Sequence, residues 1–165
     1  MNIKRIFKHL TYGRLHVLRQ FPAVSMKAIE SAIAASESRH MGELRFAVEA
    51  ALDWRELWHG ITPRQRAIEV FSRLRIWDTE HNSGVLIYLL LAERRVEIVA
   101  DRGIHERVGD AGWSGICREM EQAFRAEHFE QGVLTGIERI SALLCQHFPA
   151  QGNNPNELPN APVII

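Results

Sequence analysis

The sequence predicts an α/β protein, a three-layer α/β/α sandwich around a small mixed β-sheet. Residues 85–92, VLIYLLLA, form an apolar run that has the length of a strand buried on both faces and is too short to span a bilayer. Residues 95–101 then largely alternate, as expected of a strand that returns antiparallel beside the first. Upstream, an alternating strand pattern at 43–50 precedes a helix signal, which predicts a right-handed crossover that makes 43–50 parallel to 85–92.

The first helices follow from apolar spacing and from end signals. Residues 2–21 place apolar side chains at helical spacing, with an interruption at Gly13, and Pro22 ends this segment. A helix over about 23–38 follows, for which we expect Ser25 as the N-cap.

The crossover helix has a capping box. Residues 53–60 form a loop or a short helical turn. Thr62, Pro63 and Gln65 then supply an N-cap, a proline at the first helical position and the reciprocal side chain of the box.

Two more helices and a tail follow the hairpin. A short turn over 103–109 leads to Asp110, the expected N-cap of the next helix, and the last helix spans about 129–147. The tail beyond Pro149 is rich in proline and should lack regular structure, except for a candidate edge strand at 163–165.

The chain of 165 residues suits one folded domain at 23–148, between a basic amphipathic segment, 1–22, and a Pro/Asn-rich tail, 149–165. Residues 1–29 hold six basic and no acidic residues, which leaves 14 basic against 20 acidic residues in the remainder. This balance disfavours a nucleic-acid partner for the domain and leaves an anionic partner for the basic segment open. The segment is either an amphipathic helix on an anionic membrane surface, or a helix packed on the domain, or a frayed arm.

No common catalytic signature is present. The sequence lacks the HExxH, CxxC, P-loop, GxSxG and GxGxxG patterns of zinc, redox, nucleotide and serine-hydrolase sites. Cys117 and Cys145 fall on apolar helix faces, which favours reduced, buried thiols. The basic start lacks the apolar region and cleavage site of a signal peptide, so we expect a cytoplasmic protein, with the inner membrane as a candidate peripheral location.

One group of oxygen ligands stands out. Oxygen-bearing side chains occupy alternate positions along residues 78–84, and a hairpin places this turn at the same sheet edge as residue 101. Such side chains suit Ca²⁺, which takes roughly six to eight oxygen ligands. A solvated turn is the alternative. The candidate metal ligands are Asp78, Asn82, Asp101 and Asp110, with Glu43 and Glu80 within reach.

Three segments and the tail carry a resemblance to a known family. The segments are FSRLRIWDTE (71–80), NSGVLIYLLLAERRVEIVADRGIHERVGDAGW (82–113) and FRAEHFEQGVLTGIERI (124–140), followed by the tail NELPNAPVI (156–164). Over about 25–148 the chain closely resembles the TPM domain, also called the TPM phosphatase family, and its tail is similar to that of short bacterial members described as membrane proteins. The resemblance implies a three-layer α/β/α fold. It also implies calcium binding, weak acid phosphatase activity, or repair and assembly of membrane protein complexes.

The resemblance bears on the candidate ligands. Asn82 stands where many members have an aspartate and Ser83 where they have an asparagine, whereas Asp101 stands where they have a glycine. Asp110 matches a family aspartate. We therefore expect a binding or adaptor module that acts near membrane proteins or an anionic membrane surface. A weak, metal-assisted acid phosphatase, with Asp101 or Asp110 as ligand or base, and a purely structural domain are the alternatives.

Overall fold

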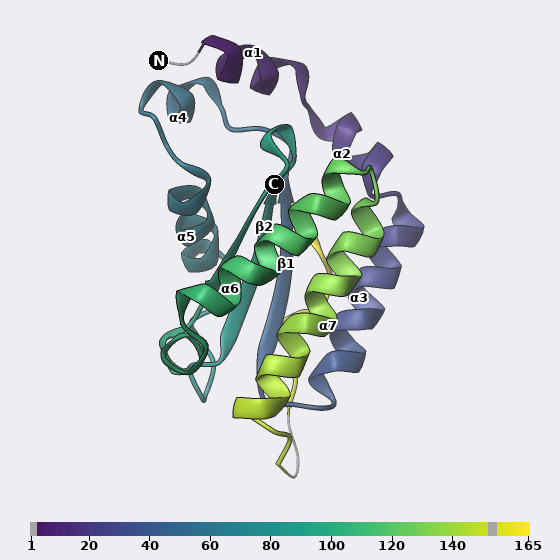
Figure 1. The fold of residues 1–165 in the computed structure, drawn as a ribbon, viewed down its shortest axis with the longest axis vertical. Helices are drawn as coiled ribbons and strands as arrows, with labels where there is room; N and C mark the ends of the chain where they lie inside the picture. Colours follow the sequence, from purple (N-terminus) through teal and green to yellow (C-terminus); the bar gives the residue numbers. More distant parts are fainter. Residues whose placement is uncertain (1–2, 152–154) are drawn as a thin grey trace.

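A four-stranded mixed sheet lies at the centre of the computed structural model, which describes residues 3–151 and 155–165 (Figure 1). The strands are β1 (Glu43–Glu49), β2 (Gly84–Leu90), β3 (Arg95–Ala100) and β4 (Val163–Ile164). Their order is β3-β2-β1-β4, with β1 parallel to β2 and β4, and β3 antiparallel to β2. The predicted parallel pairing of the first two strands, the hairpin and the edge strand are all confirmed.

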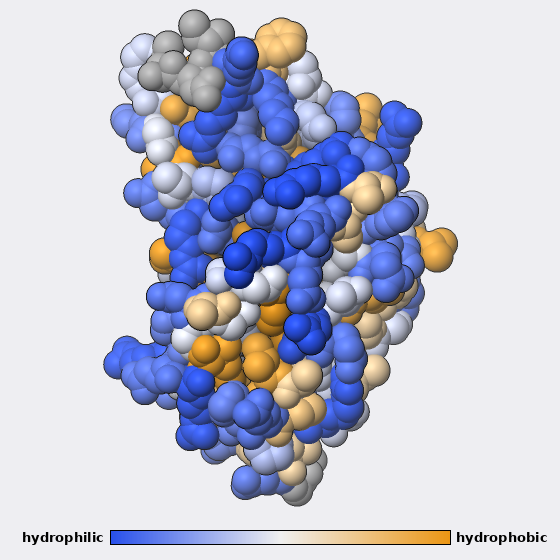
Figure 2. Space-filling view, viewed as in Figure 1, coloured by the Kyte–Doolittle hydropathy of each residue, from blue (hydrophilic) through white to orange (hydrophobic). Residues whose placement is uncertain are grey.

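Helices cover both faces of the sheet. They are α1 (Ile3–Thr11), α2 (Arg14–Gln20), α3 (Ala23–Glu37), α4 (Trp54–Trp58), α5 (Pro63–Arg73), α6 (Arg102–Arg125) and α7 (Phe129–His147). The helices α3, α6 and α7 pack on one face and α5 on the other, which confirms the three-layer sandwich (Figure 1). The face formed by α6 and α7 is largely hydrophilic, with one hydrophobic area in its lower half (Figure 2).

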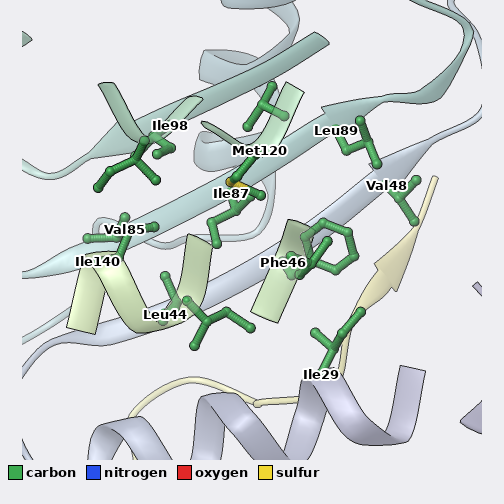
Figure 3. Packing of buried hydrophobic residues seen from close by; sticks show 14 of the residues in the cluster. Ile29, Leu44, Phe46, Val48, Val85, Ile87, Leu89, Ile98, Met120 and Ile140 are labelled. Carbon is green, nitrogen blue, oxygen red and sulfur yellow. The ribbon is translucent and has the colours of Figure 1, made fainter. Parts of the chain in front are cut away.

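The larger core lies between the sheet and the three helices. Alternate strand residues such as Phe46 and Ile87 are fully buried there. They meet Ile29 of α3, Met120 of α6 and Ile140 of α7 (Figure 3). Apolar burial of this kind contributes about 25 cal/mol per Å² and is the main term that holds the layers together.

The opposite face of β1 carries charged side chains inside the protein. Glu43, Arg45 and Glu49 lie on this face, yet every residue of β1 is buried. Buried charges must be paired or hydrogen-bonded, so this face requires specific polar partners. Glu49 finds its partner in α5, and Glu43 finds its partner in the tail.

One predicted N-cap was wrong, and one predicted helix is preceded by an additional helical stretch. The N-cap of α3 is Pro22 rather than Ser25, whose buried hydroxyl donates to Glu130. The helix expected from Asp110 is present, but a further helical stretch precedes it and begins at Arg102, where the Asp101 carboxylate accepts the Arg102 amide at 2.7 Å and caps the helix. The expected turn over 103–109 is reduced to Gly109, whose non-helical backbone separates the two helical stretches of α6 and whose φ of 71° is accessible to glycine.

Candidate functional site

The predicted sheet edge is present in the backbone. The strand register pairs Glu43 with Gly84 and Val85 with Ala100, so the starts of β1 and β2 and the end of β3 share one edge. A Cβ on Gly103 would lie 2.7 Å from the Asn82 carbonyl oxygen. The first turn of α6 therefore packs directly against the 81–82 turn.

The candidate ligands on this edge point to different partners. Asp78 and Asn82 are exposed, and Asp110 is 95% exposed, with its Oδ1 3.7 Å from Nε2 of His105. Asp101 Oδ1 is taken by the helix cap. Within residues 3–151 and 155–165, no three His, Cys, Asp or Glu side chains are grouped so that they could hold a metal ion. The structure brings the Asn82 turn and Asp101 together but does not gather the four predicted side chains.

The two further acidic residues contact the tail. Glu43 is buried, and its Oε2 accepts the Leu158 amide at 3.1 Å. The Glu80 amide donates to Oε2 of Glu157 at 3.0 Å. Both residues thus hold the tail against the sheet.

Two carboxylate oxygens at this edge are not accounted for by these contacts. Oδ2 of Asp101 and Oε1 of Glu43 are buried and have no hydrogen-bond partner among the described residues. A buried carboxylate oxygen without a partner is costly, so a cation near either oxygen would reduce that cost.

The opposite edge, at the carboxyl ends of β1 and β2, holds a buried ionic network. Arg66 of α5 donates to both oxygens of Glu49, at 2.9 and 2.8 Å, and Tyr88 donates to Glu49 at 2.5 Å. Arg66 also lies 2.8 Å from Glu56 of α4 and 2.9 Å from Glu69. Burial raises the pKa of Tyr88, and Glu49 raises the pKa of Arg66, so neither group exchanges protons near neutral pH. The network ties α4 and α5 to the sheet.

The helix α1 packs on this same edge through polar side chains. Glu93, in the single turn η1 (Leu91–Glu93), accepts from Arg5 at 2.7 Å and from His9 at 2.9 Å. The other nitrogen of His9, Nδ1, accepts the Leu52 amide at 2.9 Å, so the ring proton is on Nε2. The hydrogen bonds from His9 and then Arg5 lower the pKa of Glu93 to about 2. Of the predicted arrangements of this segment, a helix packed on the domain is the one observed.

The apolar side of α1 is left in solvent as a consequence. Phe7 is 70% and Leu10 72% exposed, while Ile6 packs on the core beneath α5. Leu15 of α2 is exposed as well. We call Phe7, Leu10 and Leu15, together with the exposed Lys4, Lys8 and Arg14, the arm surface. Among the described residues, no helix has both the length and the apolar character needed to cross a membrane.

The helix α2 is part of the folded body. Val17 and Phe21 are fully buried in the larger core, where Phe21 contacts Phe46 and Phe129. The domain boundary after residue 22 stays a prediction. Removal of the residues before it would expose the larger core to solvent.

A cleft of about 460 Å³ runs along the outer edge of β3, between α5 and α6. Arg64 donates to the Ile98 carbonyl at 2.5 Å, and Glu121 accepts the Val96 amide at 3.2 Å. These side chains occupy backbone groups that a further strand would use, which protects the edge. Burial raises the pKa of Cys117 in this cleft to about 11, so its thiol stays protonated and unreactive.

Comparison with known proteins decides the family. Residues 20–143 match the TPM domain. The chain belongs to the TPM domain family. A solved structure of BA42, a protein from the psychrophilic bacterium Bizionia argentinensis, is 30% identical, with a TM-score of 0.77 over 87% of this chain and 94% of that one. The N-terminal domain of a P. gingivalis protein is 17% identical, with a TM-score of 0.62 over 79% and 82%. No curated protein matches this TPM domain.

The sequence interpretation missed the carboxyl edge of this TPM domain. Glu49 and Glu93 both end apolar strand segments, and Tyr88 carries the one hydroxyl in VLIYLLLA. A polar group in a strand buried on both faces needs a partner, and that requirement was the available signal. The sequence could not indicate that Arg66 and His9 are the partners, because these contacts depend on helix packing.

Proposed function

We propose that this TPM-domain protein is a binding module that attaches peripherally to anionic membrane surfaces through the arm surface. The observation that carries the proposal is the orientation of α1. This helix meets the body through Arg5, Ile6 and His9. It leaves Phe7 and Leu10 exposed. A helix packed only for stability would bury its apolar side.

The charge of the arm surface matches such a partner. Lys4, Lys8 and Arg14 are exposed beside the apolar residues, and each basic residue near an anionic bilayer contributes about 1 kcal/mol. Insertion of the apolar side chains adds about 25 cal/mol per Å² removed from water. The two terms act together only at an anionic lipid surface.

Vesicle co-sedimentation tests the proposal. The wild type should pellet with phosphatidylcholine vesicles that contain phosphatidylglycerol, less so at high salt, and little with phosphatidylcholine alone. Phe7→Ser/Leu10→Ser should abolish pelleting. Ile68→Ser/Trp77→Ser, which removes two exposed hydrophobic residues outside the arm surface, should pellet like the wild type. Equal pelleting of both double variants would refute the proposal.

A second candidate function, binding of a divalent cation such as Ca²⁺, is favoured by the unpaired Oδ2 of Asp101 beside the 78–84 turn. Exposed Asp78 and the Asn82 carbonyl oxygen would supply further oxygens. A metal-assisted phosphatase would need this cation first, so that alternative depends on the same test.

Thermal unfolding with and without calcium provides that test. A cation that binds only the folded state at a hundredfold excess over Kd stabilises it by about 2.7 kcal/mol, so the midpoint should rise. Asp101→Asn keeps a helix cap and should remove the rise. Asp110→Asn should leave it unchanged, because that carboxylate faces solvent. A wild-type thermal midpoint that does not change with calcium, magnesium or manganese would exclude the cation site.

A further inference from the structure

The short helix α4 exposes a pair of tryptophans. Trp54 and Trp58 are 66% and 68% exposed, and their spacing of four residues places them on the same side of the helix. Leu57, between them in the sequence, is buried in the core beneath α5. Large aromatic rings dominate burial energies, and an adjacent exposed pair is typical of an interaction surface.

The body holds this pair in place. The Asp53 carboxylate accepts the amides of Arg55 at 2.7 Å and Glu56 at 2.9 Å, which caps the helix. The Glu56 carboxylate then lies 2.8 Å from the buried Arg66. The Asp53 cap and the ion pair of Glu56 with Arg66 fix α4 on the body. The outward side of this helix is therefore pre-organised and loses little conformational entropy on binding.

The pair lies beside the arm surface. The guanidinium of Arg5, in α1, donates at 2.8 Å to the carbonyl of Ile61, three residues beyond α4. Ile6 packs on the same apolar cluster as Leu57. Both helices lie at the same end of the molecule, at the top of Figure 1.

The chemistry of the pair suits the headgroup region of a bilayer. An indole ring is a large apolar body with one N–H donor, and tryptophan concentrates at the membrane–water interface for this reason. The Arg55 guanidinium lies 5.4 Å from the Trp54 ring centre and adds a positive charge beside the rings. Anionic lipid would therefore meet both an aromatic and a cationic group on α4.

We propose that Trp54 and Trp58 form a second, rigid anchor that enters the interface of the same anionic bilayer beside Phe7 and Leu10. This inference rests on the proposed function, since it assigns part of the same docking surface. The arm surface supplies most of the positive charge, and α4 supplies aromatic side chains in a fixed position that insert into the interface.

The test follows tryptophan fluorescence on vesicles that contain phosphatidylglycerol and brominated acyl chains, which quench a ring in contact with them. The chain has four tryptophans. Trp113 is buried, and Trp77 is exposed in the turn near the start of β2, at the other sheet edge. Wild type and Trp77→Phe should be quenched. Trp54→Phe/Trp58→Phe should lose the quenching yet still pellet, and Trp54→Ser/Trp58→Ser should bind about tenfold more weakly.

The outcomes separate the two proposals. Wild type that pellets with these vesicles without quenching, or with quenching that survives Trp54→Phe/Trp58→Phe, would overturn the tryptophan anchor and leave the arm surface in place. Wild type that does not pellet would overturn the proposed function and the anchor together. Unchanged thermal midpoints in the variants, expected for exposed positions, show that folding is not the cause.

Discussion

Arg66 is the cation on which carboxylates from β1, α4 and α5 depend. Replacement by methionine keeps much of its length but leaves Glu49 buried without its bidentate partner. We expect Arg66→Met to lower the free energy of unfolding by about 3–5 kcal/mol. Arg139→Met breaks the exposed pair with Glu119 and should cost about 0–1 kcal/mol. Urea unfolding measures both, and similar losses would contradict the assigned role of burial.

Glu37 makes stability depend on pH. Burial raises its pKa to about 8 from 4.5, against an opposing hydrogen bond from the Leu44 amide. Between these values the folded protein keeps the proton and the unfolded chain releases it. The contribution of Glu37 to the free energy of unfolding is therefore complete below pH 4.5 and is lost as the pH rises through about 8.

The variant Glu37→Gln retains an acceptor for Leu44 and removes the titration. We expect its free energy of unfolding to fall less than that of the wild type as the pH rises through this window. Glu138→Gln, at an exposed position, should keep the wild-type slope in the same window. Urea unfolding at several pH values compares the slopes, and a wild-type slope in Glu37→Gln would exclude Glu37 as the source.

At the scale of the element, α1 is held on the body by Glu93. Hydrogen bonds to charged groups contribute about 1.5–3 kcal/mol, so Glu93→Gln should speed amide exchange in α1 about tenfold or more. Exchange in α7 should not change. Because the pKa of Glu93 is lowered to about 2, its contribution is present above 4.5 and is lost as the pH falls towards 2. Hydrogen-exchange mass spectrometry detects this release, and protection of α1 as in the wild type would show that Ile6 alone holds the helix.

The sequence predicted elements better than contacts. The capping box of Thr62 and Gln65 and the run VLIYLLLA are local signals, and both led to the correct element. The first helical stretch of α6, before Gly109, was missed because Asp101 and Asp110 are equally good caps by type, and the packing of Gly103 on the Asn82 turn, which favours a helix start at Asp101, is not a local signal. The shared edge followed from strand topology, but the directions of its side chains did not.

At the scale of the whole molecule, the tail covers the open edge of β1. Ile165 donates to the Val48 carbonyl at 2.9 Å, and Val163 pairs with Ala47. A chain that ends at Pro162 should lose about 1–2 kcal/mol of stability through the missing strand contacts. Its exposed edge should also increase self-association, because unpaired edges recruit other strands. Light scattering after size-exclusion chromatography measures self-association. A shortened chain with the same size distribution as the full chain would contradict the protection of this edge by the tail.

The pairing of β1 with the tail also sets an order of events during synthesis. Leu158 contacts Glu43, which was added 115 residues earlier. At about 5–20 residues per second, the ribosome leaves the edge of β1 open for on the order of ten seconds after β1 has been made. The hairpin and crossover can form in that interval, but the fourth strand cannot. The nascent chain is therefore most open to chaperones, and to misassembly with its neighbours on a polysome, at β1.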